Sequence, residues 1–172
     1  MLKVLVDYPS AAEEYVVVER NTSPTEPPAR VIDTKTLLEY QRATDAVYVD
    51  PQIIQYAVRL STATRDPSAV GLPELARYVS FGASPRASIN MVLGAKALAF
   101  LDGRDYALPA DARDLARDVL RHRVVLSYEA LADGVSPDDL LGPVLAAVDE
   151  PDIRLQEHDA DGSGRSWSAQ QS

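Results

Sequence analysis

The chain has 172 residues, 46% apolar and 25% charged, which predicts one sizeable core with room for a small appended piece. Its net charge of −9 argues against a nucleic-acid-binding surface, because such a surface requires a basic face. The absence of cysteine excludes disulfides and cysteine-based metal sites, and no apolar run approaches the roughly 20 residues that span a bilayer.

Metal binding and targeting are also disfavoured by the residues present. Only His122 and His158 could supply imidazole ligands, and they lie far apart in the sequence, so we expect no metal site. Residues 1–4 lack the layout of a signal peptide. We therefore expect a cytoplasmic protein that binds neither nucleic acid nor a membrane.

The N-terminus combines a strand pattern with a helix pattern. Residues 2–6 place Lys3 among apolar side chains, which predicts a short strand with no partner strand nearby in the sequence. A capping box at 10–13 opens a helix that we expect to run to Arg20. The side chains expected to turn inward from this helix are Ala12, Tyr15 and Val16.

The next segments alternate loops and helices. Three prolines predict a linker or exposed loop at 21–30. Asp33 can cap a helix that extends to about Thr44, and residues 47–49 are extended. A second helix starts at Asp50-Pro51, and its spacing predicts an inward face formed by Ile54, Ala57, Val58 and Ser61. We expect a loop at 64–72, whereas 75–81 fits either a short helix or an extended segment.

The chain is organised around a helix expected over 84–101. Ser84 can cap it, Pro85 suits its first position, and its nearly all-round apolar surface predicts burial among other helices. Arg86 is unexpected, because a cation in the first turn faces the positive end of the helix macrodipole. Either a nearby carboxylate pairs with Arg86, or an anion binds at this helix start. Lys96 falls in the same broad sector, and it either contacts that anion or extends along apolar neighbours.

The patterns remain helical to about residue 150. A helix from Pro109 has an inward apolar stripe, and its solvated face is expected to contain Asp111, Arg113, Asp114 and Arg117. Residues 124–128 predict a short strand. Ser136-Pro137 starts a last helix, which Gly142-Pro143 should kink or split. The polar composition of 151–172, Trp167 included, predicts disorder.

The sequence contains no motif for self-sufficient catalysis. Its three lysines, Lys3, Lys35 and Lys96, lie outside any phosphate-binding loop, and neither a nucleophile elbow nor a metalloprotease motif is present. The carboxylates occupy helix caps, helix surfaces and the tail. Residue chemistry alone therefore does not indicate an enzyme.

Three segments resemble the C-terminal part of the MoxR family of AAA+ ATPases. They are LKVLVDYPS at 2–10, GASPRA at 82–87, and the stretch at 103–124 that begins GRDY and ends VLRHRV. Their order and spacing fit the family over about residues 2–150. The resemblance implies a mainly α fold: a helical-bundle lid domain with short β segments and an orphan core strand at the N-terminus.

The resemblance also divides the chain and assigns roles. It makes 1–9 the last strand of an ATPase core and the hinge, 10–150 the lid, and 151–172 a disordered tail. The lid would cover ATP bound to a P-loop core. Arg86 then corresponds to the sensor-2 arginine, which reaches the γ-phosphate. The positions implied to accompany it at the nucleotide are Ser84, Pro85, Tyr8 and Pro9.

The Walker motifs, sensor 1 and the arginine finger of the family are not in this sequence, so we expect a truncated piece of a longer parent. The resemblance implies that the parent hydrolyses ATP with Mg²⁺, forms a hexamer and remodels client proteins like a chaperone. The piece alone should neither hydrolyse ATP nor bind it tightly. Two alternatives are a stand-alone helical adaptor, which would expose an apolar groove, and the lid of a related chelatase or helicase-type AAA+ protein.

Overall fold

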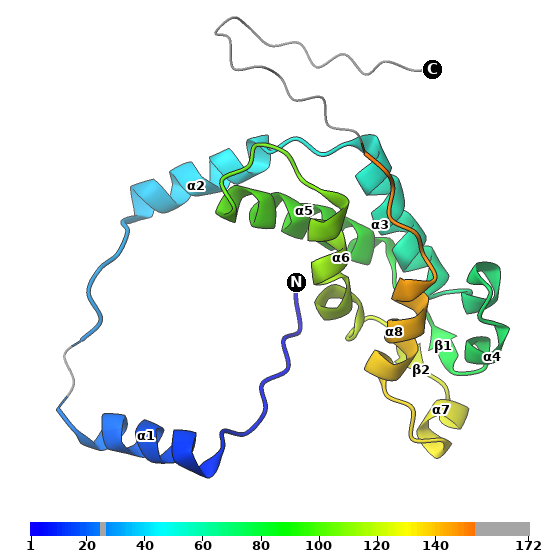
Figure 1. Ribbon diagram of the computed structural model, residues 1–172, viewed down its shortest axis with the longest axis horizontal. Coiled ribbons are helices and arrows are strands. Elements are labelled where there is room, and N and C mark those ends of the chain that lie inside the picture. Colours follow the sequence, from blue (N-terminus) through cyan, green and yellow to red (C-terminus); the bar gives the residue numbers. More distant parts are fainter. Residues whose placement is uncertain (25–26, 154–172) are drawn as a thin grey trace, which may run out of the picture.

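The fold consists almost entirely of α-helices. The computed structural model describes residues 1–24 and 27–153. The elements in them, shown in Figure 1, are α1 (Ala11–Thr22), α2 (Thr34–Ala46), α3 (Pro51–Ala63), the 3₁₀-helix η1 (Pro67–Val70), α4 (Pro73–Ala76), β1 (Val79–Phe81), α5 (Pro85–Leu101), α6 (Pro109–Leu120), β2 (Val125–Leu126), α7 (Tyr128–Ala132) and α8 (Pro137–Ala146). The predicted fold class, mainly α with short β segments, is confirmed.

The core lies where α3, α5 and α6 meet, with α8 packed against α3 and α6. The α5 helix contributes small buried side chains, Ala87, Ala95 and Ala99, together with Met91. Small residues let neighbouring helices approach closely, so the large buried side chains come mostly from the partners. These are Ile53, Tyr56 and Leu60 on α3, Val119 and Leu120 on α6, and Leu140 and Leu141 on α8.

The predicted inward face of α3 is confirmed for Ala57 and Ser61, which are buried, but is wrong for its other two residues. On α3, Ile53, Tyr56 and Leu60 are buried, whereas Ile54 and Val58 are each 45% exposed. The α3 helix carries two apolar stripes, and only the one facing α5, α6 and α8 is covered. The α5 helix is likewise not buried all round, because its other face, including Ile89, is exposed.

Residues 1–10 do not form the expected strand. A lone strand leaves its backbone groups unpaired. Here the segment lies against the C-terminal end of α6 instead: the Lys3 N–H donates to the Asp118 carbonyl at 2.9 Å, and Arg121 donates to the Lys3 carbonyl at 2.9 Å.

The α1 helix begins as predicted but has no buried face. Ser10 and Glu13 form the expected capping box, and the hydrogen bond from the Ser10 hydroxyl lowers the pKa of Glu13. No residue of α1 is buried, and Figure 1 shows the helix standing apart from the bundle. The predicted inward orientation of Ala12, Tyr15 and Val16 is therefore wrong, because the described residues provide no surface for them to pack on.

A two-stranded antiparallel sheet closes one end of the bundle. The ambiguous stretch at 75–81 divides into the end of α4 and strand β1, in which Val79 lies opposite Leu126 of β2. The strand predicted at 124–128 is shorter than expected, because the Ser127 side chain caps α7 and so starts a helix there.

The α8 helix runs through Gly142-Pro143 without a break. Proline removes one backbone hydrogen bond, but buried side chains on both sides of it, Leu140 and Val144 among them, hold the helix in the core. The disorder predicted for the tail falls mostly on 154–172, Trp167 included, which lie outside the described residues.

Asp111 does not belong to the solvated face of α6. It is 6% exposed, and its carboxylate accepts two bonds from the Arg104 guanidinium, at 2.7 and 2.8 Å. It also accepts from the Leu108 N–H at 2.7 Å. The prediction failed because the turn at Gly103, whose φ is +73°, folds Arg104 back over the start of α6.

Candidate functional site

The segment that leads into α5 is held by the C-terminal end of α3. The hydroxyl of Thr64 accepts from the Ala83 N–H at 2.9 Å and donates to the Ser61 carbonyl at 2.7 Å. Arg65 Nε donates to the Ala83 carbonyl at 2.7 Å. Gly82 lies so close to α3 that a Cβ placed there would be 2.5 Å from the Thr64 carbonyl oxygen.

The start of α5 is as predicted in backbone but not in capping. Ser84 has the extended conformation of an N-cap and Pro85 is the first helical residue. The Ser84 hydroxyl accepts no cap hydrogen bond, so the predicted contribution of its side chain is wrong. The backbone anchoring of Ala83 from α3 fixes the entry to the helix in its place.

Arg86 is exposed in the first turn of α5. Within residues 1–24 and 27–153, no carboxylate pairs with its guanidinium and no hydrogen bond engages it. The alternative of a neighbouring Asp or Glu partner therefore finds no support in the described part of the chain. A free cation at the positive end of a helix is a site of unbalanced positive potential.

An apolar groove of about 430 Å³ lies beside this cation, between α3 and α5. It is formed by the uncovered stripes of the two helices, with Ile54 and Val58 on one side and Ile89 and Leu93 on the other. The complete lining is Ile54, Val58, Thr62, Arg65, Pro85, Ser88, Ile89, Val92 and Leu93. Arg65 is the charged residue in this set, so the groove has apolar walls and no acidic group.

Lys96 does not join Arg86 in a second cationic position. Its Nζ donates to the Asp45 carbonyl at 2.8 Å, in the last turn of α2. A cation at the C-terminal end of a helix satisfies an otherwise unpaired carbonyl and complements the dipole. The described contact therefore gives Lys96 a structural role.

Tyr8 and Pro9 are not brought to Arg86 in this structure. Both are exposed, Tyr8 completely, and they lead directly into α1. In Figure 1 the start of α1 lies far from the N-terminal end of α5.

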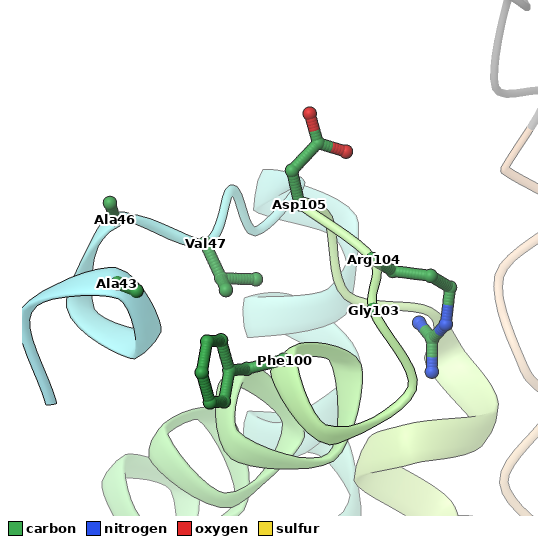
Figure 2. Close-up of a pocket in the computed structure, with 7 residues that line it drawn as sticks. All are labelled: Ala43, Ala46, Val47, Phe100, Gly103, Arg104 and Asp105. Atoms are coloured by element: carbon green, nitrogen blue, oxygen red, sulfur yellow. The ribbon is translucent and has the colours of Figure 1, made fainter. Parts of the chain in front are cut away.

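A second hollow, of about 290 Å³, lies between the end of α2 and the end of α5. Figure 2 shows the Phe100 ring turned toward Ala43 and Val47, whereas Arg104 and Asp105 point away from it. Arg104 is occupied by its ion pair with Asp111. This hollow thus combines small apolar walls with no free polar group directed inward.

Across the described ranges, no group of three or more His, Asp or Glu side chains is arranged to hold a metal ion. None of the helices in those ranges is long and apolar enough to cross a bilayer.

Comparison with known proteins places these features in a family. Residues 75–144, which include β1, α5, α6 and most of α8, match the model of the AAA lid domain. The chain is 40% identical to Chaperone MoxR1 of Mycobacterium tuberculosis over 154 residues, which is 89% of this chain and 41% of that protein. It is 27% identical to Protein MoxR of Paracoccus denitrificans, over 88% of this chain and 48% of that protein.

A solved structure gives the same result for the fold. The crystal structure of a presumed ATPase from Cytophaga hutchinsonii matches with a TM-score of 0.81 and 33% identity, over 88% of this chain and 46% of that one. The chain thus spans less than half the length of each of these relatives. It carries the lid region of a MoxR-family AAA+ ATPase.

Proposed function

We propose that this lid covers ATP and Mg²⁺ bound to a P-loop core, with Arg86 as the sensor-2 arginine that contacts the γ-phosphate. The observation that carries the proposal is a first-turn cation of α5 with no partner among the described residues, inside the segment that matches the AAA lid domain. A triphosphate is the kind of anion that such a helix start attracts. Arg86 would act by electrostatic stabilisation of the transferring phosphoryl group.

The apolar groove supports a contact between this face and the core. Ile54, Val58 and Ile89 are about half exposed, although side chains of this size stabilise a fold by being buried. A core domain seated on this face would cover them and bring its nucleotide to Pro85 and Arg86. Ser84 and Pro85 would then approach ATP through their backbone, with Tyr8 and Pro9 reaching it once 1–9 pairs with the core.

The proposal extends to the whole protein. Residues 1–9 would be the last core strand and hinge, and 10–150 the lid. The complete protein would be a cytoplasmic ATPase that assembles with its neighbours as a hexamer. It would remodel client proteins, which agrees with the name of its relative Chaperone MoxR1. The 172-residue chain alone would neither hydrolyse ATP nor bind it tightly.

The test compares two exposed arginines in the complete ATPase. Arg86→Ala should lower kcat for ATP hydrolysis by about a hundredfold, the scale for losing one preorganised donor to a developing charge. The control is Arg42→Ala on α2, because the Arg42 side chain is also exposed and takes part in no hydrogen bond or ion pair among the described residues. Arg42→Ala should leave kcat within twofold, because a surface substitution that removes no contact has little effect.

A stability measurement accompanies the activity. Because Arg86 has no partner in the described chain, Arg86→Ala should change the free energy of unfolding of the 172-residue protein by no more than about 0.5 kcal/mol. Normal hydrolysis by the Arg86→Ala enzyme would refute the sensor-2 role.

A stand-alone adaptor is the second candidate, and the exposed groove is the observation that favours it. An adaptor would bind its partner through the groove without any nucleotide. Ile89→Glu would then abolish partner binding, while Arg86→Ala would leave every measured activity unchanged.

A further inference from the structure

We propose that Thr64 and Arg65 are positioning residues for Arg86. They hold the entry to α5 so that Arg86 is aimed at the phosphate before the nucleotide arrives. This inference rests on the proposed function. It gives the C-terminal end of α3 a role in the reaction, although that segment is far from Arg86 in the sequence.

The first support is that two consecutive residues hold both polar backbone groups of Ala83. The Thr64 hydroxyl accepts from the Ala83 N–H at 2.9 Å, and Arg65 Nε donates to the Ala83 carbonyl at 2.7 Å. Ala83 and Thr64 are fully buried, so water cannot replace these bonds. The peptide groups before and after Ala83 are therefore both held in place.

The second support is that two further contacts fix the segment on both sides of Arg86. Before it, Gly82 approaches the backbone of Thr64 and Arg65 so closely that no side chain would fit. After it, the Ser88 hydroxyl donates to the Ser61 hydroxyl at 2.9 Å. The backbone of Arg86 therefore lies between attachment points at 82–83 and at 88, while its side chain remains exposed.

This combination is what electrostatic catalysis requires. A cation stabilises developing charge most when it is already in place, because no reorganisation is then needed during the reaction. A long side chain is mobile, so its effective position depends on how firmly its Cα is held. The hydrogen bonds from Thr64 and Arg65 supply that restraint at a site where Ser84 provides no cap of its own.

The chemistry of Thr64 is specific. Its hydroxyl hydrogen is used on the Ser61 carbonyl, which leaves an oxygen lone pair for the Ala83 N–H. Serine can reproduce both bonds, whereas valine has the same shape and can make neither. Thr64→Val and Thr64→Ser therefore separate the hydrogen bonds from the packing.

The first measurement is amide hydrogen exchange on the 172-residue chain. Thr64→Val should accelerate exchange of the Ala83 amide by about tenfold or more relative to the core amide of Leu120, and Thr64→Ser should restore protection. The matched control is Thr44→Val on α2, where the threonine hydroxyl donates to the Tyr40 carbonyl of its own helix and to no other group in the described part of the chain. It should leave Ala83 unaffected.

The second measurement is ATP hydrolysis by the complete ATPase. Thr64→Val should lower kcat by about tenfold to a hundredfold, the range expected for a small misplacement of a reacting group, with KM nearly unchanged. Thr64→Ser should restore kcat. The double variant Thr64→Val/Arg86→Ala should be no slower than Arg86→Ala alone, because a positioning residue has nothing left to position.

The outcomes are distinguishable. Normal kcat in Thr64→Val, or a loss that adds fully to that of Arg86→Ala, overturns the positioning role even if Arg86 is essential. No effect of Arg86→Ala by itself refutes the proposed function, and the inference falls with it. If Thr64→Val fails to fold, Arg65→Met applies the same test, since it removes the bond to the Ala83 carbonyl from a more exposed side chain.

Discussion

Removal of the Asp111 carboxylate is the change to which the fold should respond most clearly. The carboxylate accepts three hydrogen bonds: two from Arg104, at 2.7 and 2.8 Å, and one from the Leu108 N–H at 2.7 Å. The side chains of the ion pair are 8% and 19% exposed. Asp111→Ala would leave the Arg104 guanidinium largely buried, with the exposed Asp102 and one carbonyl as its remaining partners.

The expected loss can be bounded from this geometry. Removing one partner of a buried ion pair destabilises a protein by about 3–5 kcal/mol. Asp102 retains a bond to Arg104 at 2.9 Å, which places the expectation near the lower limit, at about 3 kcal/mol. For a domain of this size, that corresponds to a fall in Tm of about 6–12 °C.

The assay is urea denaturation of the 172-residue chain, with Tm measured in parallel. Asp114→Ala is the control, because Asp114 lies on the exposed side of the same helix and should change stability by no more than about 0.5 kcal/mol. Replacing both partners, as Arg104→Met/Asp111→Leu, should recover most of the loss, since an apolar pair leaves no buried charge. Equal losses in Asp111→Ala and Asp114→Ala would refute the reasoning.

Three other changes test separate features of the fold. Tyr56→Phe should be nearly neutral in urea denaturation, because the buried Tyr56 hydroxyl has no hydrogen-bond partner among the described residues; a loss above about 2 kcal/mol would reveal one. Gly82→Ala should cost about 1–3 kcal/mol, since its Cβ would overlap the backbone of Thr64 and Arg65, and an unchanged urea midpoint would contradict that contact. The Ser136 hydroxyl lowers the pKa of Asp139 below its ordinary 3.8, so this contribution is present above that pH and is lost as the pH falls through the lowered pKa. Ser136→Ala should therefore weaken the pH dependence of stability below about pH 4, and an identical acid titration of stability in the two proteins would exclude the coupling.

Helix starts could be predicted because their signals are local. The side chains of Ser10, Asp33, Asp50 and Ser136 all accept the cap hydrogen bonds that their positions indicate. Ser84 is the exception among these polar caps. Its helix entry is set by residues about twenty positions earlier in the chain, and no capping rule includes a partner at that distance.

The buried face of α3 could be predicted only in part, through Ala57 and Ser61, and that of α1 could not be predicted at all. Both faces of α3 offer apolar stripes, and the packing of α5, α6 and α8 selects the one with Ile53 over the one with Ile54. The α1 helix has apolar side chains but no packing partner in the described chain. Burial is a property of the neighbour as much as of the helix, so a single sequence leaves it open.

Asp111 was misassigned for a related reason, although a signal existed. Leu108 has no side-chain oxygen to cap α6, so an acid three residues later is the group available to accept its N–H. A helix that starts with proline and lacks a polar N-cap side chain therefore predicts that an acid in its first turn accepts the N–H of the N-cap residue. The partner Arg104, seven residues before Asp111, follows only from the turn at Gly103.

Arg104 and Arg86 together indicate how a functional cation differs from a structural one. Arg104 precedes α6 and Arg86 lies in the first turn of α5, and both helices start with proline. The residue types around the two arginines do not tell them apart. The fold surrounds Arg104 with two carboxylates and a carbonyl, while Arg86 receives none of these within the described chain and is instead held by its backbone. The hydrogen bonds to Ala83 satisfy buried backbone groups, so they stabilise the fold and also fix the start of α5 beneath the unpaired charge of Arg86. The unpaired charge in the first turn of α5, inside the segment that matches the AAA lid domain, is what gives Arg86 a functional interpretation, and the restraint applied by Thr64 and Arg65 gives that charge a fixed position.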